Sequence, residues 1–333
     1  MMKKKSILQL AFLLFLVAGT ILIIRQQQHL PYITNKGRVF GTYYTITYQH
    51  AEDLQKDIEK ALKEVDNEFS MFNDSSTVAR INRGENPALS PTFLKVFDLA
   101  KQVNKATFGA FDITVAPLVN AWGFGFRSEQ LPDSAQIDSL LQFVGMEKIG
   151  ISVDKKDKKV SHITKSNAGI MLDFSAIAKG YGCDVVSRLM RKHSIRNYMI
   201  EVGGEVVCHG KNPNGEYWHI GISKPSEENT QELQTVVDVK DEALATSGNY
   251  RRFYYQNGQR RAHTIDPRTG YPVNHTLLSA TVLAHDCATA DAYATAFMVL
   301  GIDKAKEIIL ANNLKAYLIY TDGDDAYAIW ENL

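Results

Sequence analysis

A carboxylate and a hydroxyl four residues apart form the first arrangement in this chain that could do chemistry. Asp291 and Thr295 fall within residues 287–300, a segment whose composition predicts a helix. Positions i and i+4 of an α-helix lie on one face, so both oxygen ligands would project together. Such hard ligands suit Mg²⁺ or Ca²⁺. The alternative is a structural acid near a helix N-terminus, where the macrodipole favours it.

A second arrangement joins an apolar run to an expected helix start. The run ends at Asp173, a helix is predicted over 176–192, and Lys179 lies one turn inside it. A helix N-terminus presents free N–H groups and partial positive charge, which suit a phosphate. A capped helix start with a packed Gly-Tyr-Gly crossing explains the same residues equally well, so this segment alone leaves both interpretations open.

Three further segments place polar or aromatic side chains beside turn signals. His263 precedes the turn-forming residues 266–270 and could act as a general acid or base, although a lone histidine is more often structural. The aromatic-rich stretch 107–123 contains Asp112 and could enclose a flat ring or simply belong to the core. The paired glycines within 201–205 could let the backbone approach a ligand, or form a plain hairpin.

The elements that must position these residues mix helices and strands irregularly. Apolar residues at helical spacing predict helices over 52–69, 91–107, 176–192, 287–300 and 302–312. Strands are predicted over 38–48, 149–153, 160–164, 198–202, 205–209, 217–223, 235–239, 251–256, 278–284, 315–320 and 326–330. Because regular βαβ alternation is absent, the sequence predicts an α+β fold, formed by one domain over 30–333.

The charge distribution argues against one class of partner. The 333 residues include 37 Lys and Arg and 37 Asp and Glu, and residues 1–29 hold four of the basic residues and no acid. The body is therefore mildly acidic and has no electrostatic footprint for nucleic acid. The three cysteines form no CxxC pair, so a cysteine zinc site is not expected. They are interpreted as small buried hydrophobes, and one disulfide stays open.

The N-terminal residues predict a membrane anchor. Lys3, Lys4 and Lys5 precede an apolar-rich stretch of 18 residues over 7–24, which at ~1.5 Å per residue gives ~27 Å as a helix. The lysines favour a cytoplasmic tip, with the body translocated. Thr20 stands where a bacterial lipoprotein cleavage box needs its lipidated cysteine. The expectation is therefore an uncleaved, single-pass transmembrane helix within 1–29, in the bacterial inner membrane, with the domain on the periplasmic side.

Taken together, these segments resemble the FAD:protein FMN transferase family, also called ApbE or thiamine-biosynthesis lipoprotein. The resemblance runs from about Gly41 to the C-terminus. It rests on four motifs in order: Asp173-Phe-Ser-Ala-Ile-Ala-Lys-Gly, Glu201-Val-Gly-Gly, His263-Thr-Ile-Asp-Pro-Arg-Thr-Gly and Asp291-Ala-Tyr-Ala-Thr. Each motif is weak alone, whereas their combination is specific. Two departures are Phe40, where many members carry Met, and the absent lipidated cysteine.

The resemblance implies a fold, a reaction and a set of ligands. It implies mixed sheets flanked by helices, with FAD in a cleft between lobes, and Mg²⁺-dependent transfer of FMN to a Ser or Thr hydroxyl of an acceptor protein. A phosphoester forms and AMP is released. Mg²⁺ would bind the backbone carbonyl of Ala176 and the side chains of Asp291 and Thr295. FAD would contact Phe72, Ala110, Phe111, Asp112, Asp173, Lys179 and Val273.

Several roles stay open at this level. An alcohol nucleophile needs a base within ~3 Å, and His263 is the leading choice, with Asp112 or Asp291 as rivals. The expected acceptor is a flavin-bearing subunit of a membrane redox complex. Two alternatives are a Mg²⁺-dependent FAD pyrophosphatase that yields FMN and AMP, and an FAD-binding protein without turnover.

Overall fold

A computed structural model gives the structure of the protein. It describes residues 8–10, 12–20, 30–126, 131–154, 157–158, 160–225, 232–249, 253–256, 259–322 and 326–333. Within these ranges no helix has both the length and the apolar character needed to cross a membrane. The predicted anchor over 1–29 lies partly outside the described residues, because 1–7, 11 and 21–29 are not among them.

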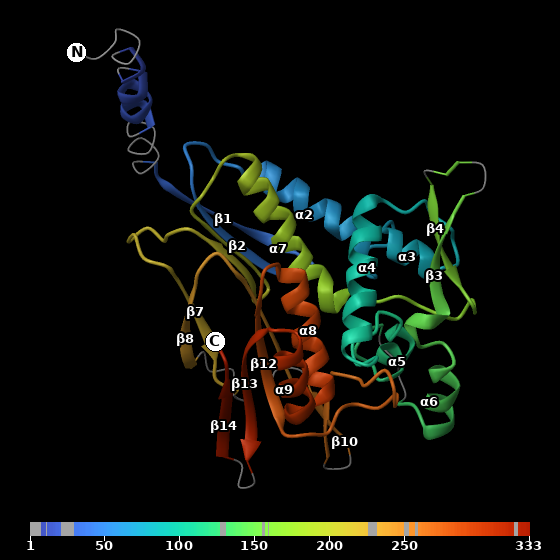
Figure 1. Cartoon of the computed structure of the whole chain (residues 1–333). Helices are drawn as coiled ribbons and strands as arrows, with labels where there is room; N and C mark the ends of the chain where they lie inside the picture. The colour runs from blue at the N-terminus through green and yellow to red at the C-terminus, as the bar shows by residue number, and fades with distance from the viewer. Residues whose placement is uncertain are drawn as a thin grey trace.

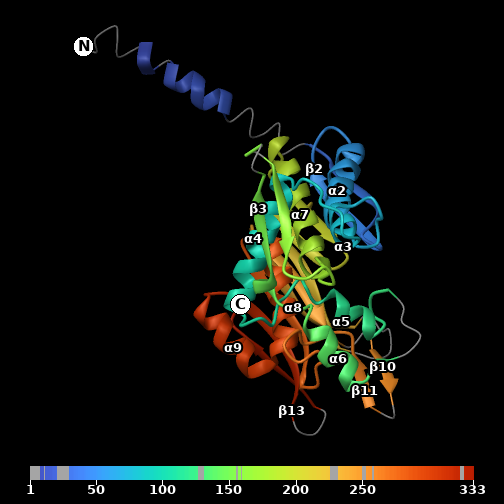
Figure 2. The same cartoon turned by 90° about the vertical axis from the view of Figure 1, so that its right-hand side faces the viewer.

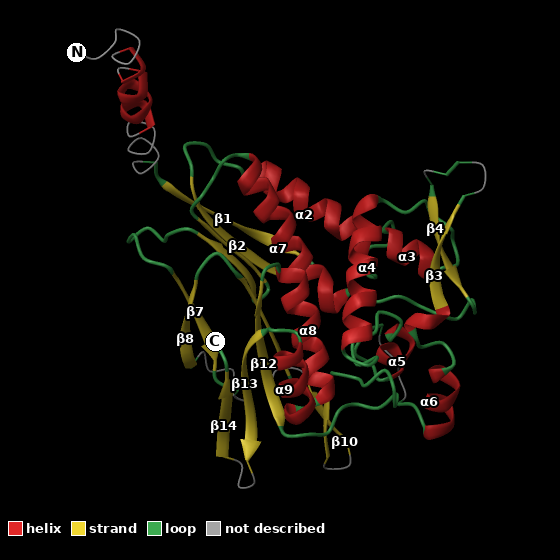
Figure 3. Cartoon of the chain, viewed as in Figure 1, coloured by secondary structure: helices red, strands yellow, loops and turns green. Residues whose placement is uncertain are grey.

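The centre of the molecule is an eight-stranded antiparallel sheet, which confirms the α+β prediction (Figure 3). Its strands follow the spatial order β1-β2-β5-β6-β9-β12-β13-β14. In that order they are β1 (Tyr32–Val39), β2 (Thr42–Gln49), β5 (Tyr198–Val202), β6 (Glu205–His209), β9 (Ala243–Gly248), β12 (Leu277–Ala284), β13 (Lys315–Asp322) and β14 (Ala326–Glu331). Side chains alternate between faces along each strand, so each face can support its own core.

Helices cover one face of this sheet, and a β-hairpin covers part of the other (Figure 1). The helices are α2 (Gln55–Phe69), α4 (Pro91–Ala106), α7 (Ser175–Lys192), α8 (Cys287–Leu300) and α9 (Ile302–Ala311). On the opposite face, β7 (Trp218–Ser223) and β8 (Leu233–Val239) form the hairpin. Its Trp218 and Ile222 join Val206 and Leu244 of the sheet in a separate apolar cluster. The sheet thus separates two cores.

Smaller elements surround the helical side (Figure 2). They are α3 (Thr77–Asn82), α5 (Ala116–Ala121), α6 (Ser134–Leu141), a 3₁₀ turn (Met146–Lys148), and the hairpins β3 (Ile149–Val153) with β4 (Ser161–Lys165) and β10 (Phe253–Gln256) with β11 (Gln259–Ala262). Leu118 of α5 and Ile137 of α6 cluster with Ile265. The Trp122 Nε1–H also donates to the Gly270 carbonyl at 2.8 Å. The loop that follows His263 is therefore held from two helices.

The central sheet opens between β6 and β9. These strands pair only through Val206 with Leu244 and Val207 with Ala243. Strand β6 begins at Glu205, directly after the turn from β5, so it does not extend beyond this point. Strand β9 continues to Gly248 and pairs on its other side with β12. The gap that results is bordered by the ends of α7 and α8 and forms part of the cavity described below.

Most predicted elements are present, whereas α3, α5, α6, the 3₁₀ turn and β11 were not predicted. Two further differences affect the site. The strand predicted over 38–48 is a hairpin, because Phe40 and Gly41 have φ of 52° and 72° and form a two-residue turn between β1 and β2. Strand β9 was not predicted at all. Its sequence, Ala-Leu-Ala-Thr-Ser-Gly, contains few residues with β propensity, yet it lies inside the sheet. Small side chains there leave room for α8 to pack closely.

Candidate functional site

The site is built on a close crossing of α7 and α8. A Cβ placed on Gly180 would lie 2.6 Å from the carbonyl carbon of Cys287 and 2.9 Å from Cα of Ala288. No side chain fits between backbones at such distances, so the crossing requires glycine. One turn later, Asp184 accepts the N–H groups of Cys287 at 2.8 Å and Ala288 at 3.0 Å. Helix α7 therefore fixes where α8 begins.

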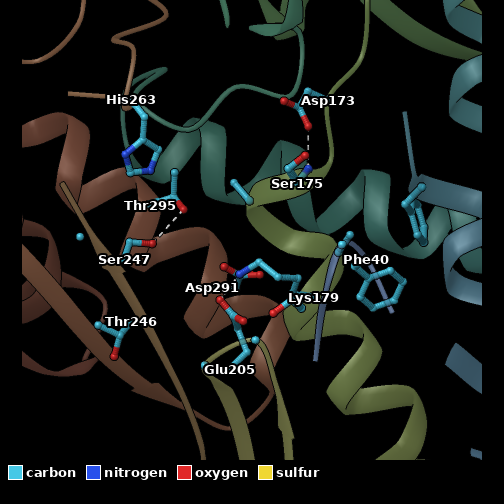
Figure 4. Close-up of a pocket in the computed structure, with 18 of the residues that line it drawn as sticks. Phe40, Asp173, Ser175, Lys179, Glu205, Thr246, Ser247, His263, Asp291 and Thr295 are labelled. Atoms are coloured by element: carbon cyan, nitrogen blue, oxygen red, sulfur yellow. Dashed lines mark hydrogen bonds and ion pairs between the residues drawn. The ribbon is translucent and has the colours of Figure 1, made fainter. Parts of the chain in front are cut away.

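The crossing brings the three predicted metal ligands to one cavity. Ala176, Asp291 and Thr295 all line it, and Asp291 is only 2% exposed. Figure 4 shows Asp291 and Thr295 at this cavity. The Gly180 N–H donates to Oδ2 of Asp291 at 3.1 Å. Thr295 lies one helical turn beyond Asp291, and its Oγ1 is 3.2 Å from Oγ of Ser247 on β9. The i, i+4 arrangement expected from sequence is therefore present.

These three residues fit a divalent cation of the Mg²⁺ type. They offer a carboxylate, a hydroxyl and a carbonyl, which are hard oxygen ligands. The Gly180 N–H, which a regular helix directs to the Ala176 carbonyl, lies within hydrogen-bond distance of Oδ2 of Asp291. A carbonyl oxygen has two lone pairs, so that of Ala176 can bind a cation even if it also accepts a helix hydrogen bond. Burial raises the pKa of Asp291, against the opposing effect of Lys179. A cation would stabilise the ionised carboxylate.

The three residues differ in composition from most protein metal centres. Among the residues that the structure describes, no group of three or more His, Cys, Asp or Glu side chains is placed to hold a metal ion. The set formed by Ala176, Asp291 and Thr295 contains only one such side chain. A cation bound there would therefore depend on backbone and hydroxyl oxygens, and on water or substrate oxygens for its remaining ligands.

Lys179 does not present an isolated positive charge to the cavity. Its ammonium donates to Oε1 of Glu205, the first residue of β6, and the two form an ion pair. Burial opposes the charge on Lys179, but the carboxylates of Asp291 and Glu205 outweigh it and raise the pKa of Lys179. Burial likewise raises the pKa of Glu205, against the lowering effect of Lys179. The sequence placed Lys179 one turn inside the helix but gave no sign of this partner.

The start of α7 faces the same cavity. Ser175 and Ala176 line it, and Oδ1 of Asp173 accepts the Ser175 N–H at 2.7 Å. N–H groups in the first turn have no partner inside a helix, and the macrodipole makes this end partly positive. The predicted helix start therefore lies at the cavity wall, with Asp173 beside it, and its contact with a phosphate stays a prediction.

His263 also lines the cavity, as the sequence predicts. Its ring meets the Phe124 ring edge-on, with centroids 6.3 Å apart. The next residue is fixed because Oγ1 of Thr264 donates to Oδ1 of Asn249 at 2.6 Å. Figure 4 shows His263, Asp291 and Thr295 on the lining of the same cavity. An imidazole so placed can accept a proton from a substrate bound in the cavity.

Asp112 is less suited to be a base. Its Oδ1 accepts the N–H and Oγ1–H of Thr114 at 2.8 and 2.6 Å, and its Oδ2 accepts the Met146 N–H at 3.1 Å. Burial raises the pKa of Asp112 in spite of these hydrogen bonds. Both oxygens are thus used to hold the 110–114 turn against the 3₁₀ turn. Asp112 borders the cavity, and its hydrogen bonds hold the cavity wall in place.

Six of the seven predicted FAD contacts line the cavity, and Val273 does not. The Val273 N–H instead donates to the Thr264 carbonyl at 3.0 Å. Phe111 is 2% exposed and belongs to the core, so its ring is not the exposed face expected for stacking. Phe72 is 63% exposed and lies 5.3 Å from the Phe126 ring. Of these two predicted aromatic contacts, Phe72 is therefore the one with an exposed ring.

The cavity has a volume of about 1180 Å³. Pockets for small molecules usually measure about 300–1,000 Å³, so this one has room for a large ligand and part of a second one. It reaches from the hairpin turn at Gly41 and Thr42, through the gap between β6 and β9, to His263 and β7. Its walls therefore come from both faces of the sheet.

Two residues of the site were not assigned from the sequence. Glu205 stands at the head of an otherwise apolar strand, which was a weak sign of a special role. In the sequence, Ser247 stands next to Gly248 and Asn249, which resemble a loop, and nothing local connects it with Thr295. Both are brought to the site by strand order, which local patterns do not encode.

The chain is similar to known proteins over most of its length. A model of the ApbE family matches residues 40–318. The chain is similar to the FAD:protein FMN transferase of Haemophilus influenzae, with 37% identity over 316 residues that cover 91% of this chain and 90% of that protein. The FAD:protein FMN transferase of Escherichia coli is 32% identical over 305 residues, which cover 89% and 86%.

Two solved structures are similar over most of their length. The flavin transferase ApbE from Vibrio cholerae superposes with a TM-score of 0.81 at 35% identity, covering 91% of this chain and 97% of that one. The apo form of the Pseudomonas stutzeri flavinyl transferase ApbE superposes with a TM-score of 0.80 at 28% identity, covering 91% and 95%. All residues that line the cavity fall within residues 40–318, the part of the chain that the ApbE family model matches.

Proposed function

The chain belongs to the ApbE family, and we propose from this premise that it is an FAD:protein FMN transferase, which moves FMN from FAD to an acceptor protein. The observation that carries the proposal is the crossing of α7 and α8. It gathers a helix N-terminus, a buried carboxylate and a hydroxyl on the wall of one large cavity. That combination suits a dinucleotide, whose pyrophosphate carries negative charge.

The finer chemistry follows from the bonds that must change. A Ser or Thr hydroxyl of the acceptor attacks the flavin-side phosphorus of FAD, so one oxygen–phosphorus bond forms. The bond from that phosphorus to the bridging oxygen breaks, and AMP leaves. The hydroxyl proton passes to a ring nitrogen of His263, which lines the cavity and is positioned by its neighbour Thr264. The product is an FMN phosphoester on the acceptor.

The residues of the α7–α8 crossing would stabilise the phosphates. Ala176, Asp291 and Thr295 would hold Mg²⁺, which when bound neutralises charge on phosphate oxygens. The first turn of α7 directs its N–H groups toward the same region, beside Asp173. Phe72, whose ring is exposed at the cavity, offers a flat apolar surface for a flavin ring.

The transfer can be tested by co-expression with a flavin-bearing subunit of a membrane redox complex. Intact-mass measurement should show one FMN adduct on the acceptor, and chromatography should show AMP formed in equal amount. Asp291→Ala should abolish the adduct. AMP released at the same rate without any acceptor would instead indicate FAD pyrophosphatase activity, and FAD bound without AMP release would indicate a binding protein.

We also propose that the domain faces the periplasm from the inner membrane. The proposal is supported by Lys3, Lys4 and Lys5 ahead of the 18-residue apolar stretch over 7–24. An acceptor in the same membrane would then meet the enzyme at a raised local concentration. Membrane fractionation of cells, with protease added to spheroplasts, tests this. A full-length protein found in the cytosolic fraction would contradict it.

A further inference from the structure

We propose that Glu205 is a positioning residue that neutralises Lys179 and thereby sets the affinity of the Asp291 site for Mg²⁺. The inference rests on the proposed function, because that function gives the cation its task. Glu205 is 2% exposed and lines the cavity. Its Oε1 accepts a hydrogen bond from the Lys179 ammonium, and its Oε2 is a buried oxygen without a hydrogen-bond partner in the described part of the chain.

The backbone holds Glu205 in this place from two directions. Gly203 and Gly204, with φ of 65° and 106°, form the turn that precedes it, and a Cβ on Gly203 would lie 2.7 Å from Cγ2 of Thr42. The Glu205 carbonyl also accepts the Cys183 thiol of α7 at 3.3 Å. The carboxylate is therefore fixed against the same helix that carries Lys179, with little freedom to move away.

Glu205 acts on the buried Asp291 carboxylate through the charge of Lys179. Lys179 and Asp291 both line the cavity and lie next to each other in Figure 4. Their charges interact, since each shifts the pKa of the other. Without Glu205, the ammonium would turn its full charge toward Asp291 and compete with a cation for that carboxylate. With Glu205 as its partner, Lys179 is held on the β6 side, and Asp291 stays available. Such effects are large where water is scarce.

The unpartnered Oε2 points to a second contribution. A buried carboxylate oxygen without a donor carries a desolvation cost that is not offset. A water molecule bound to the cation could donate to this oxygen, as groups around metal ligands often do. Glu205 would then act on the cation through that water as well as through Lys179, without being a direct ligand.

The test is a Mg²⁺ titration of the full-length protein without FAD, read as the rise in melting temperature with Mg²⁺ concentration. Glu205→Gln should weaken Mg²⁺ binding roughly 10–100-fold, the range seen when groups around metal ligands are removed. Lys179→Met should leave the affinity unchanged or increase it. The double variant should regain most of the affinity, because it removes the ammonium that Glu205 no longer neutralises.

The matched control is Glu201→Gln. Glu201 is an acid on the same hairpin that accepts the Gly204 N–H at 2.8 Å, and this substitution should leave Mg²⁺ affinity unchanged. Wild-type affinity in Glu205→Gln, or no recovery in the double variant, would overturn the inference. If Glu205→Gln does not fold, the double variant, which removes both members of the Lys179–Glu205 pair, decides: near-wild-type Mg²⁺ affinity supports the inference, and a clear loss of affinity overturns it. Acceptor flavinylation by the wild type tests the proposed function independently of these affinities.

Discussion

Replacing Gly180 by alanine tests whether the α7–α8 crossing builds the site. The new Cβ would meet the Cys287 carbonyl carbon at 2.6 Å and Cα of Ala288 at 2.9 Å. Carbon atoms in contact normally lie about 3.5–4.0 Å apart, so the two backbones must separate by roughly 1 Å. The obstacle is backbone on both sides, and no rotamer change can relieve it.

The displacement has two measurable consequences. Overpacking of this kind costs about 1–3 kcal/mol of the free energy of unfolding. A shift of about 1 Å between Ala176 and Asp291 exceeds the ±0.2 Å tolerance typical of a metal site and can reduce the reaction rate roughly 100-fold. Urea unfolding measures the first, and Mg²⁺ titration with acceptor flavinylation by mass measures the second.

The matched control lies on the same helix. A Cβ on Gly182 would meet only side chains, the Phe40 ring at 2.8 Å from Cε2 and Leu62 at an ordinary 3.5 Å, and a side chain can move where a backbone cannot. Both substitutions gain the same helix propensity, about 1 kcal/mol, so their difference isolates the crossing. The reasoning is refuted if Gly180→Ala binds Mg²⁺ and flavinylates the acceptor as the wild type does, or if Gly182→Ala is equally impaired.

Three further predictions concern single residues. His263→Gln should lower the rate of FMN transfer about 10²–10⁴-fold while FAD binding, followed by flavin fluorescence, stays unchanged; unchanged transfer would assign the base elsewhere. Burial raises the pKa of Asp184 to about 6 from its usual 3.8, so the folded state takes up this proton first as pH falls. As pH falls from about 6 to about 4, protonation of Asp184 should therefore increase the free energy of unfolding by at most about 3 kcal/mol. Urea midpoints at pH 7.5 and 4.5 measure this increase, which Asp184→Asn should lack. Equal pH dependence in both proteins argues against it. Trp122→Phe removes the donor to the Gly270 carbonyl and should cost about 1–3 kcal/mol, with faster hydrogen exchange over 263–272; exchange that stays slow there would mean that the bond does not hold the loop.

The amino-acid sequence determined those features that depend on neighbouring residues. Helix α8 was predicted with the bounds that it has, and α2, α4, α7 and α9 were predicted within a few residues, because apolar side chains repeat at helical spacing. The pairing of Asp291 with Thr295 follows from the same 3.6-residue period. The order of the motifs was enough to indicate the family, although each motif alone was ambiguous.

Other features depend on how distant segments meet, and only the tertiary structure decided them. Lys179 and Glu205 are 26 residues apart and become partners because β6 passes beside α7. Ser247 reaches Thr295 through β9, a strand whose small residues give no local signal. Phe40 adopts positive φ because its turn lies between paired strands. The Asp112 carboxylate is held by the Met146 N–H, 34 residues away. Local patterns report on propensity and amphipathic faces, whereas the partner of a buried charge is set by strand order and by packing between helices.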